Sequence, residues 1–241
     1  MTREEARNKI IFALDVESMA QAERWADILA PHVGMFKIGK QLFTACGPDV
    51  VKAIIERGGE VFLDLKYHDI PNTVAMASLE AARLGARLFN LHALGGYEMM
   101  ARTVETLHRE FPDTDRARVL AVTILTSSDQ STLAEVGIGF PVSEMVVKLA
   151  MLAKKAGIDG VVASPLEISL IRAACGPDFL IVTPGVRPAF SSTDDQKRVL
   201  TPAEAIKSGA DYLVIGRPIS AAQDPIKAVD KIIEEIMTID G

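Results

Sequence analysis

Eight short apolar runs recur along this chain, and each is followed by a longer amphipathic stretch. The runs are rich in β-branched residues, too short for helices, and too continuously apolar for strands that have one face in water. Such runs are typical of parallel strands that are buried on both faces. We therefore predict eight buried strands, at Lys9–Val16, Met35–Gly39, Glu60–Lys66, Arg87–Ala93, Arg118–Leu125, Gly160–Ser164, Phe179–Val186 and Tyr212–Arg217.

The stretches between these runs have the spacing of helices, with apolar side chains three and four residues apart. Several begin beside a proline and end at a glycine, as helix starts and helix ends favour. We predict helices within residues 17–32, 48–59, 72–85, 97–111, 143–157, 165–176, 201–209 and 225–239.

Strict alternation of strand and helix, in units of about thirty residues, predicts the α/β class and a single (β/α)8 TIM barrel. A doubly wound open sheet is the alternative. The count of eight, and the polar residues at the carboxyl ends of the strands, favour the barrel. No Pro/Ser-rich linker and no shift of composition divides the 241 residues. We therefore expect residues 1–241 to form one catalytic domain.

The composition excludes several kinds of partner. Lys and Arg total 26 and Asp and Glu total 32, which gives a net charge of −6 without a dense basic run. Binding to nucleic acid or to an anionic membrane through bulk charge is therefore not expected. No apolar run approaches the roughly 18 residues of a membrane span, and the start MTREEARNKI lacks a secretory signal. With only Cys46 and Cys175, we expect a cytoplasmic protein without a disulfide framework.

Polar residues gather where the predicted strands end, which is where barrels of this kind carry their sites. The charged members matter most, because Asp and Lys are almost never buried without a partner. A structural network of ion pairs is the alternative explanation. The polar strand-end residues are Asp15, Lys37, Asp64, Lys66, Asn90, His92, Thr123, Thr126, Ser164, Thr183, Gly216 and Arg217.

The densest segment is DLKYHDIPNTV, from Asp64 to Val74. Asp64 and Lys66 stand two apart on a strand, so their side chains leave the same face. With Asp69 in the following loop, two carboxylates would flank Lys66 and favour its ammonium form. The sequence thus predicts a proton donor rather than a Schiff-base nucleophile. A metal held by Asp64 and Asp69 is the alternative, but the lysine already neutralises this cluster.

The loops after the seventh and eighth strands predict a phosphate site. They begin PGVRP, from Pro184 to Pro188, and GRPI, from Gly216 to Ile219, and barrels commonly bind phosphate at these two loops. Arg217 supplies a guanidinium fork that suits phosphate. The polar stretch between Arg187 and Arg198 is either a mobile lid over the ligand or a solvated loop.

These motifs together resemble the orotidine 5′-phosphate decarboxylase family over nearly the whole chain. FALDV, FKIG, DLKYHDIPNTV, VTILTS, TPGVRP with a downstream glutamine, and VIGRPI occur in the family's order, and the D-x-K-x-x-D-I-P-N-T string is the specific one. The resemblance implies decarboxylation of orotidine 5′-monophosphate to uridine 5′-monophosphate and CO2, the last step of de novo pyrimidine synthesis. It implies neither metal nor organic cofactor, and the chain shows no G-x-G-x-x-G after a strand and no Walker loop.

The resemblance also implies residue roles and a homodimer. Lys66 would be the proton donor within a charged array that includes Lys37, Asp64 and Asp69. Asp69 and Thr73 would reach the neighbouring subunit's site. The substrate-binding residues would be Asp15 and Lys37 at the ribose, Thr126 and Ser127 at the pyrimidine, Arg187, Gln196, Gly216 and Arg217 at the phosphate, and also Asp64, Ile70, Thr73 and Pro184.

Two other functions stay open at this point. One is a Mg²⁺-dependent aldolase similar to 3-hexulose-6-phosphate synthase, a homologous barrel with a similar D-x-K-x-x-D strand. HDIPNT, VTILTS and the downstream glutamine argue against it. The other is an inactive phosphate-binding barrel, which the complete charged set disfavours. The sequence assigns no role to His68 or His92.

Overall fold

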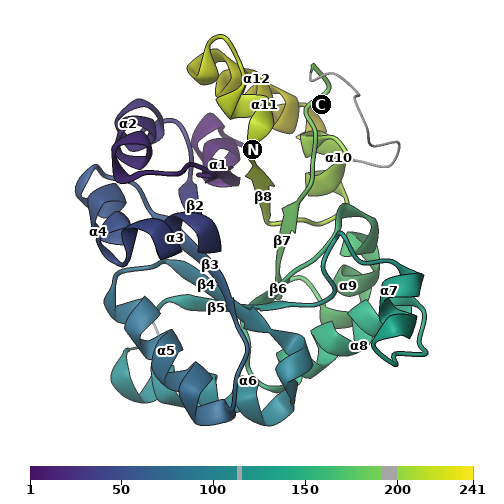
Figure 1. Cartoon of the computed structure of the whole chain (residues 1–241). Coiled ribbons are helices and arrows are strands. Elements are labelled where there is room, and N and C mark those ends of the chain that lie inside the picture. The colour runs from purple at the N-terminus through teal and green to yellow at the C-terminus, as the bar shows by residue number, and fades with distance from the viewer. Residues whose placement is uncertain (113–115, 191–199, 241) are drawn as a thin grey trace.

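Eight parallel strands close into one barrel in the computed structural model, which describes residues 1–112, 116–190 and 200–240 (Figure 1). The strands follow one another around the barrel in sequence order, and β8 pairs with β1, with Ile10 opposite Leu213. The predicted (β/α)8 barrel is therefore confirmed, and the open sheet is wrong. The strands are β1 (Ile10–Ala13), β2 (Met35–Gly39), β3 (Val61–Tyr67), β4 (Leu88–His92), β5 (Arg118–Val122), β6 (Gly160–Val162), β7 (Leu180–Pro184) and β8 (Tyr212–Ile215).

Helices lie outside the strands and cover them (Figure 1). Each predicted helical stretch overlaps one: α2 (Met19–Leu29), α4 (Asp49–Glu56), α5 (Pro71–Arg83), α6 (Gly96–Glu110), α8 (Val142–Lys155), α9 (Ile168–Cys175), α10 (Pro202–Lys207) and α12 (Pro225–Met237). Their caps explain several boundaries. Thr201 and Glu204 form a capping box at the start of α10, and Asp224 caps α12 ahead of Pro225. No helix in the described ranges is long and apolar enough to cross a membrane.

Short helices that the sequence pattern does not reveal complete the chain. They are α1 (Arg3–Asn8), α3 (Lys40–Cys46), α7 (Gln130–Glu135), α11 (Arg217–Ser220) and the 3-10 turns η1 (Ala93–Gly95), η2 (Pro165–Glu167) and η3 (Thr238–Asp240). Each is too short to show a helical period. The ion pair between Arg3 of α1 and Asp230 of α12, at 2.5 Å, joins the two ends of the chain.

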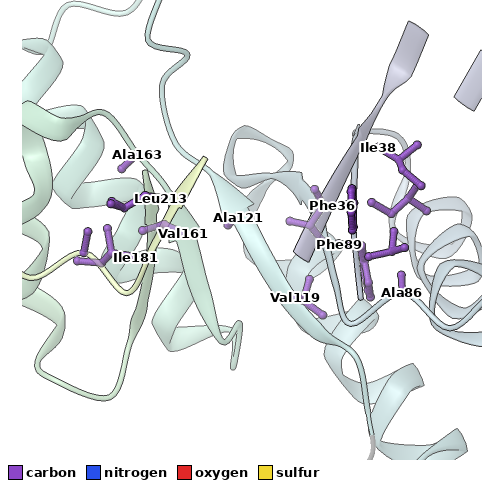
Figure 2. Packing of buried hydrophobic residues seen from close by; sticks show 14 of the residues in the cluster. Phe36, Ile38, Ala86, Phe89, Val119, Ala121, Val161, Ala163, Ile181 and Leu213 are labelled. Carbon is purple, nitrogen blue, oxygen red and sulfur yellow. The ribbon is translucent and has the colours of Figure 1, made fainter. Parts of the chain in front are cut away.

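Alternate residues of each strand belong to two different cores. The outward-facing side chains pack against the helices, and Figure 2 shows part of this layer, with Phe36 and Ile38 of β2 beside Phe89 of β4. The inward-facing side chains fill the barrel, and they include Ile11, Met35, Phe62, Leu88, Leu120, Val182 and Val214. Burial on both faces explains why the strands read as continuous apolar runs.

Candidate active site

The inside of the barrel changes from apolar to polar within two residues on three neighbouring strands. The inward apolar residues of these strands are Met35 on β2, Phe62 on β3 and Leu88 on β4. Two positions further along, on the same faces, stand Lys37, Asp64 and Asn90. Because strand residues alternate between faces, these three side chains all point into the carboxyl end of the barrel.

Lys37 links the ends of three strands. Its Nζ lies 3.2 Å from Oδ1 of Asp15, which follows β1, and 3.5 Å from Oδ2 of Asp64 on β3. The Lys37 and Asp64 side chains are only 13% and 12% exposed, whereas that of Asp15 is 70% exposed. Buried charges need partners of opposite sign, and Lys37 and Asp64 are such partners for one another.

Lys66 pairs with the other oxygen of the same carboxylate. Its Nζ donates to Oδ1 of Asp64, so Asp64 lies between two ammonium groups. Among the described residues, Lys66 is the one non-glycine residue in the left-handed region, with φ of 53°. Such a backbone conformation costs on the order of 1–3 kcal/mol and is concentrated at functional sites.

A register shift in the sheet produces this conformation. Leu63 pairs with Phe89 and Tyr67 pairs with Leu91, so Asp64, Leu65 and Lys66 all stand opposite the single residue Asn90. Extra residues of this kind leave backbone N–H and C=O groups without their usual partners on the next strand, and they turn side chains in a new direction.

Two further titratable side chains flank this cluster. Burial, followed by electrostatic interaction with His68, Lys40 and Lys66, lowers the pKa of His92 to about 4, although Asp64 opposes this. Burial raises the pKa of Tyr67 to about 12. Both groups are therefore neutral near pH 7, and the charge of the site comes from the Lys and Asp side chains.

Two adjoining cavities open on either side of the charged cluster, and both are lined by Lys37, Asp64, Lys66 and Leu125. The first, of ≈ 340 Å³, is the more polar of the two, with Asp15, Lys40 and Gln41 among its neighbours. The second, of ≈ 220 Å³, is mainly apolar, and its other walls are Phe62, Val122, Ile124, Thr126, Val162, Ala163, Pro184 and Val214. The Lys66 ammonium thus stands between a polar cleft and an apolar pocket.

A larger cavity, of ≈ 510 Å³, lies at the amino ends of the strands and holds none of the predicted site residues. Its walls include Arg7, Arg87 and Arg118, together with Tyr212 at the start of β8. Size alone therefore does not mark the functional end of this barrel. The paired charges and the carboxyl ends of the strands do.

Several predicted residues line neither of the two cavities beside the cluster. The Asp69 carboxylate is exposed and accepts the backbone N–H of Ile70 at 2.6 Å, and it makes no ion pair with Lys66 within the described chain. The expectation that two carboxylates flank Lys66 is therefore wrong within one copy, where only Asp64 does so. The remaining predicted residues that line neither of these two cavities are Ile70, Thr73, Ser127, Arg187, Gly216 and Arg217, and Gln196 lies outside the described residues.

No group of three or more His, Cys, Asp or Glu side chains in the described ranges is arranged to hold a metal ion. Of the two carboxylates that the sequence offers as metal ligands, that of Asp64 already forms ion pairs with Lys37 and Lys66. These residues therefore do not fit the alternative of a metal shared by Asp64 and Asp69.

Comparison with known proteins shows which family the chain belongs to. A family model described as "Orotidine 5'-phosphate decarboxylase / HUMPS family" matches residues 8–232. The chain belongs to this family. The matched range spans the barrel from β1 to β8, with the charged cluster of β2 and β3 inside it.

Relatives within the orotidine 5′-phosphate decarboxylase / HUMPS family match nearly the whole chain. The orotidine 5′-phosphate decarboxylase of Geotalea uraniireducens (strain Rf4) is 73% identical over 241 residues, which is 100% of both chains. That of Geotalea daltonii is 74% identical over 237 residues, covering 98% of this chain and 99% of its own. The crystal structure of orotidine 5′-phosphate decarboxylase from Lactobacillus acidophilus matches with a TM-score of 0.83 at 39% identity, covering 94% of this chain and 98% of the other.

Sequence reasoning about this family member missed two residues of the polar cleft, and it missed the role of a third residue that it had named. Lys40 and Gln41 line the polar cleft because the first turn of α3 follows β2 directly. The sequence feature that could have revealed them is their position directly after FKIG, at the carboxyl end of a predicted strand. Asn90 was recognised as a polar residue at a strand end, but nothing in the sequence shows that it contacts both Asp64 and Lys66.

Proposed function

We propose that this chain is a cofactor-independent decarboxylase that converts orotidine 5′-monophosphate to uridine 5′-monophosphate and CO2. The observation that carries the proposal is the Lys66 ammonium, held on Asp64 between the polar cleft and the apolar pocket. The names of the full-length relatives support the same reaction. The proposal assigns residues 1–241 to one catalytic domain in the cytoplasm, with no nucleic-acid or membrane partner.

The difficulty of this reaction lies in the charge that it creates. When the bond between C6 and the carboxylate breaks, the electron pair stays on C6 as a vinylic carbanion, and no adjacent carbonyl absorbs it. A fixed ammonium aimed at C6 stabilises that charge without reorganisation. Lys66 then transfers an Nζ proton to C6 and becomes a neutral amine, which takes up a proton from solvent. Carbon dioxide leaves with the former carboxylate atoms, so charge and atoms balance.

The two cavities suit the two halves of a nucleoside. The apolar pocket accepts the flat pyrimidine beside Pro184 and Thr126, with Ser127 next in the chain. The polar cleft accepts the ribose hydroxyls, which would bind Asp15 and Lys37. This assignment puts the ring carbon that reacts next to Lys66, because Lys66 lines both cavities.

The phosphate would bind beyond the ribose, at the loops that follow β7 and β8. Arg187, Gly216 and Arg217 lie after these strands, and Gln196 belongs to the same assignment but lies outside the described residues. Binding energy released at the phosphate, far from C6, can then assist the chemical step.

A second copy of the chain would complete each site. Asp69 and Thr73 are exposed and lie after β3 and in the first turn of α5, and Ile70 between them is 66% exposed. Leu94 in η1 and Tyr97 in α6 are also exposed, so an apolar partner surface fits this end of the barrel. In a homodimer, Asp69 would lie beside the departing carboxylate of the partner's substrate. Its repulsion of that group is a secondary contribution.

The decisive experiment follows the loss of orotidine 5′-phosphate absorbance after purified protein is added, with and without EDTA. The proposal predicts turnover that EDTA leaves unchanged, and Lys66→Ala protein is the matched control for background loss. Turnover of a hexulose phosphate that EDTA abolishes would instead indicate the Mg²⁺-dependent aldolase. Nucleotide binding without turnover of either substrate would indicate an inactive phosphate-binding barrel.

A further inference from the structure

One fully buried amide joins the two central charged residues of the site. The Asn90 side chain is 0% exposed on β4, and it contacts both Asp64 and Lys66 of β3. Its Oδ1 accepts the backbone N–H of Lys66 at 2.8 Å, and its Nδ2 donates to Oδ1 of Asp64 at 2.7 Å. A buried amide with both ends satisfied by the same strand specifies one arrangement of that strand.

The contact to Lys66 replaces a missing hydrogen bond of the sheet. At the register shift, Asp64, Leu65 and Lys66 face only Asn90, so the regular ladder between β3 and β4 cannot serve every backbone group. The Asn90 amide oxygen accepts the Lys66 N–H in place of a β4 carbonyl. The side chain thereby holds Lys66 in its left-handed conformation, with φ of 53°.

The contact to Asp64 follows from the first one. Because the amide oxygen is committed to the Lys66 N–H, the amide NH2 must face Asp64. An ionised carboxylate only accepts hydrogen bonds, so this donor fits the Asp64 carboxylate and fixes its rotamer. The same Asp64 oxygen accepts from the Lys66 ammonium. One side chain thus sets the backbone of Lys66 and the position of its counter-ion.

We propose that Asn90 is a positioning residue for the decarboxylation: it aims the Lys66 ammonium by holding the Lys66 backbone N–H and the Asp64 carboxylate together. This inference rests on the proposed function. It assigns Asn90 no contact with substrate, because Asn90 lines neither of the two cavities at the cluster. A misplacement of about 1 Å at a reacting group can cost about 10²-fold in rate. The structure therefore predicts a loss in kcat that substrate affinity does not share.

The first test compares Asn90→Ala with Leu91→Val. Leu91 is the next residue of β4, is fully buried, and faces the helices rather than the site, so its variant reports the cost of merely disturbing this strand. We expect Asn90→Ala to lower kcat at least about 10²-fold with KM within about threefold of wild type. Leu91→Val should retain kcat within about threefold at a similar melting temperature. Equal kcat values for the two variants would overturn the inference.

A second variant separates the two hydrogen bonds. Asn90→Asp keeps an acceptor for the Lys66 N–H but places a carboxylate oxygen opposite Asp64. Two adjacent carboxylates favour sharing one proton, and the protonated form restores a donor. Among the described residues, Lys37 and Lys66 pair with Asp64, and His92 stands two residues further along β4, with Lys40 and His68 near it. We expect the ratio of Asn90→Asp to wild-type kcat to rise as the pH falls. A ratio that is independent of pH would contradict the role of the NH2 donor.

Hydrogen exchange at the Lys66 amide tests the same geometry without any turnover. In the wild type this N–H is bonded to a buried oxygen, so it should exchange slowly. We expect at least about tenfold faster exchange at Lys66 in Asn90→Ala than in Leu91→Val of matched stability. Unchanged exchange would overturn the positioning role even if the wild type decarboxylates its substrate. Faster exchange in a protein that shows no turnover would support the positioning role while contradicting the proposed function.

Discussion

Lys66 combines a backbone conformation that favours glycine with the ammonium that the proposed chemistry requires. A substitution can therefore improve the fold and destroy the activity at once. Lys66→Gly removes the side chain and relieves the left-handed backbone, whereas Lys66→Ala removes the side chain and keeps the strain.

We expect both Lys66 variants to lose at least about 10⁴-fold in kcat, since a charge-stabilising proton donor is absent from each. Lys66→Gly should be more stable than Lys66→Ala by about 1 kcal/mol. Urea denaturation and single-turnover decarboxylation measure the two quantities. Equal stability of the two variants would show that the left-handed backbone at residue 66 carries no strain.

His92 makes the stability of the protein depend on pH. Its pKa is about 4 in the folded protein, mainly because of burial, against an ordinary value of 6.5. Between these values the unfolded chain binds the proton and the folded chain does not, so the free energy of unfolding rises with pH there. The contribution of His92 to stability is therefore lost as the pH falls from about 6.5 to about 4.

We expect the wild type to lose about 1–2 kcal/mol more than His92→Gln between pH 7 and pH 4.5, because partial exposure of the ring weakens the effect. Urea denaturation of both proteins at both pH values measures this difference, and the comparison cancels the titration of other groups. An identical loss in the two proteins would mean that His92 titrates normally in the fold.

At the scale of the element, the short strand β6 depends on a glycine. A Cβ built on Gly160 would lie 2.3 Å from the backbone oxygen of Leu180 and 2.4 Å from the Leu180 Cβ, so β6 and β7 would have to separate. Gly139 is the matched control, because a Cβ there meets no atom within 4 Å and its φ is not left-handed.

Gly160→Ala should lower the free energy of unfolding by about 2 kcal/mol, or the melting temperature by about 4–8 °C for a chain of this size. Gly139→Ala should change the melting temperature by about 1 °C at most. Calorimetry measures the melting temperatures of the two variants and of the wild type. A Gly160→Ala protein as stable as the wild type would show that β6 and β7 adapt to the added methyl group.

The same scale shows what the sequence could and could not predict. The eight strands were predictable because burial on both faces makes them continuous apolar runs, and Lys37, Asp64 and Lys66 were predictable because they end such runs. The helices α1, α3, α7 and α11 were not, since each has too few residues to show a period. The role of Asn90 was equally hidden. It depends on the register between β3 and β4, which tertiary packing sets and local sequence does not.

At the scale of the whole molecule, the proposed homodimer makes a prediction about mixed subunits. Lys66→Ala and Asp69→Ala proteins should each be nearly inactive alone. If Asp69 serves the partner's site, a mixed dimer has one complete site and one doubly defective site. Equal amounts that exchange freely form mixed dimers in about half of cases, so roughly a quarter of wild-type activity should return.

The control for this experiment is the same mixture without subunit exchange, and native mass spectrometry confirms that mixed dimers form. If Asp69 instead served its own subunit, every site in a mixed dimer would lack one group. Activity equal to the sum of the two residual activities would then rule out the shared site.

Closure of the barrel by β1 and β8 also orders events during synthesis on the ribosome. Ile10 can pair with Leu213 only after almost the whole chain has been translated. Lys37, Asp64 and Lys66 emerge early, whereas the cavity walls at Pro184 and Val214 emerge late. Until then the nascent sheet has two open edges, which are templates for aggregation. A ribosome that stalls before β8 therefore releases a chain that carries the charged cluster, lacks an enclosed cavity, and depends on chaperones to stay soluble.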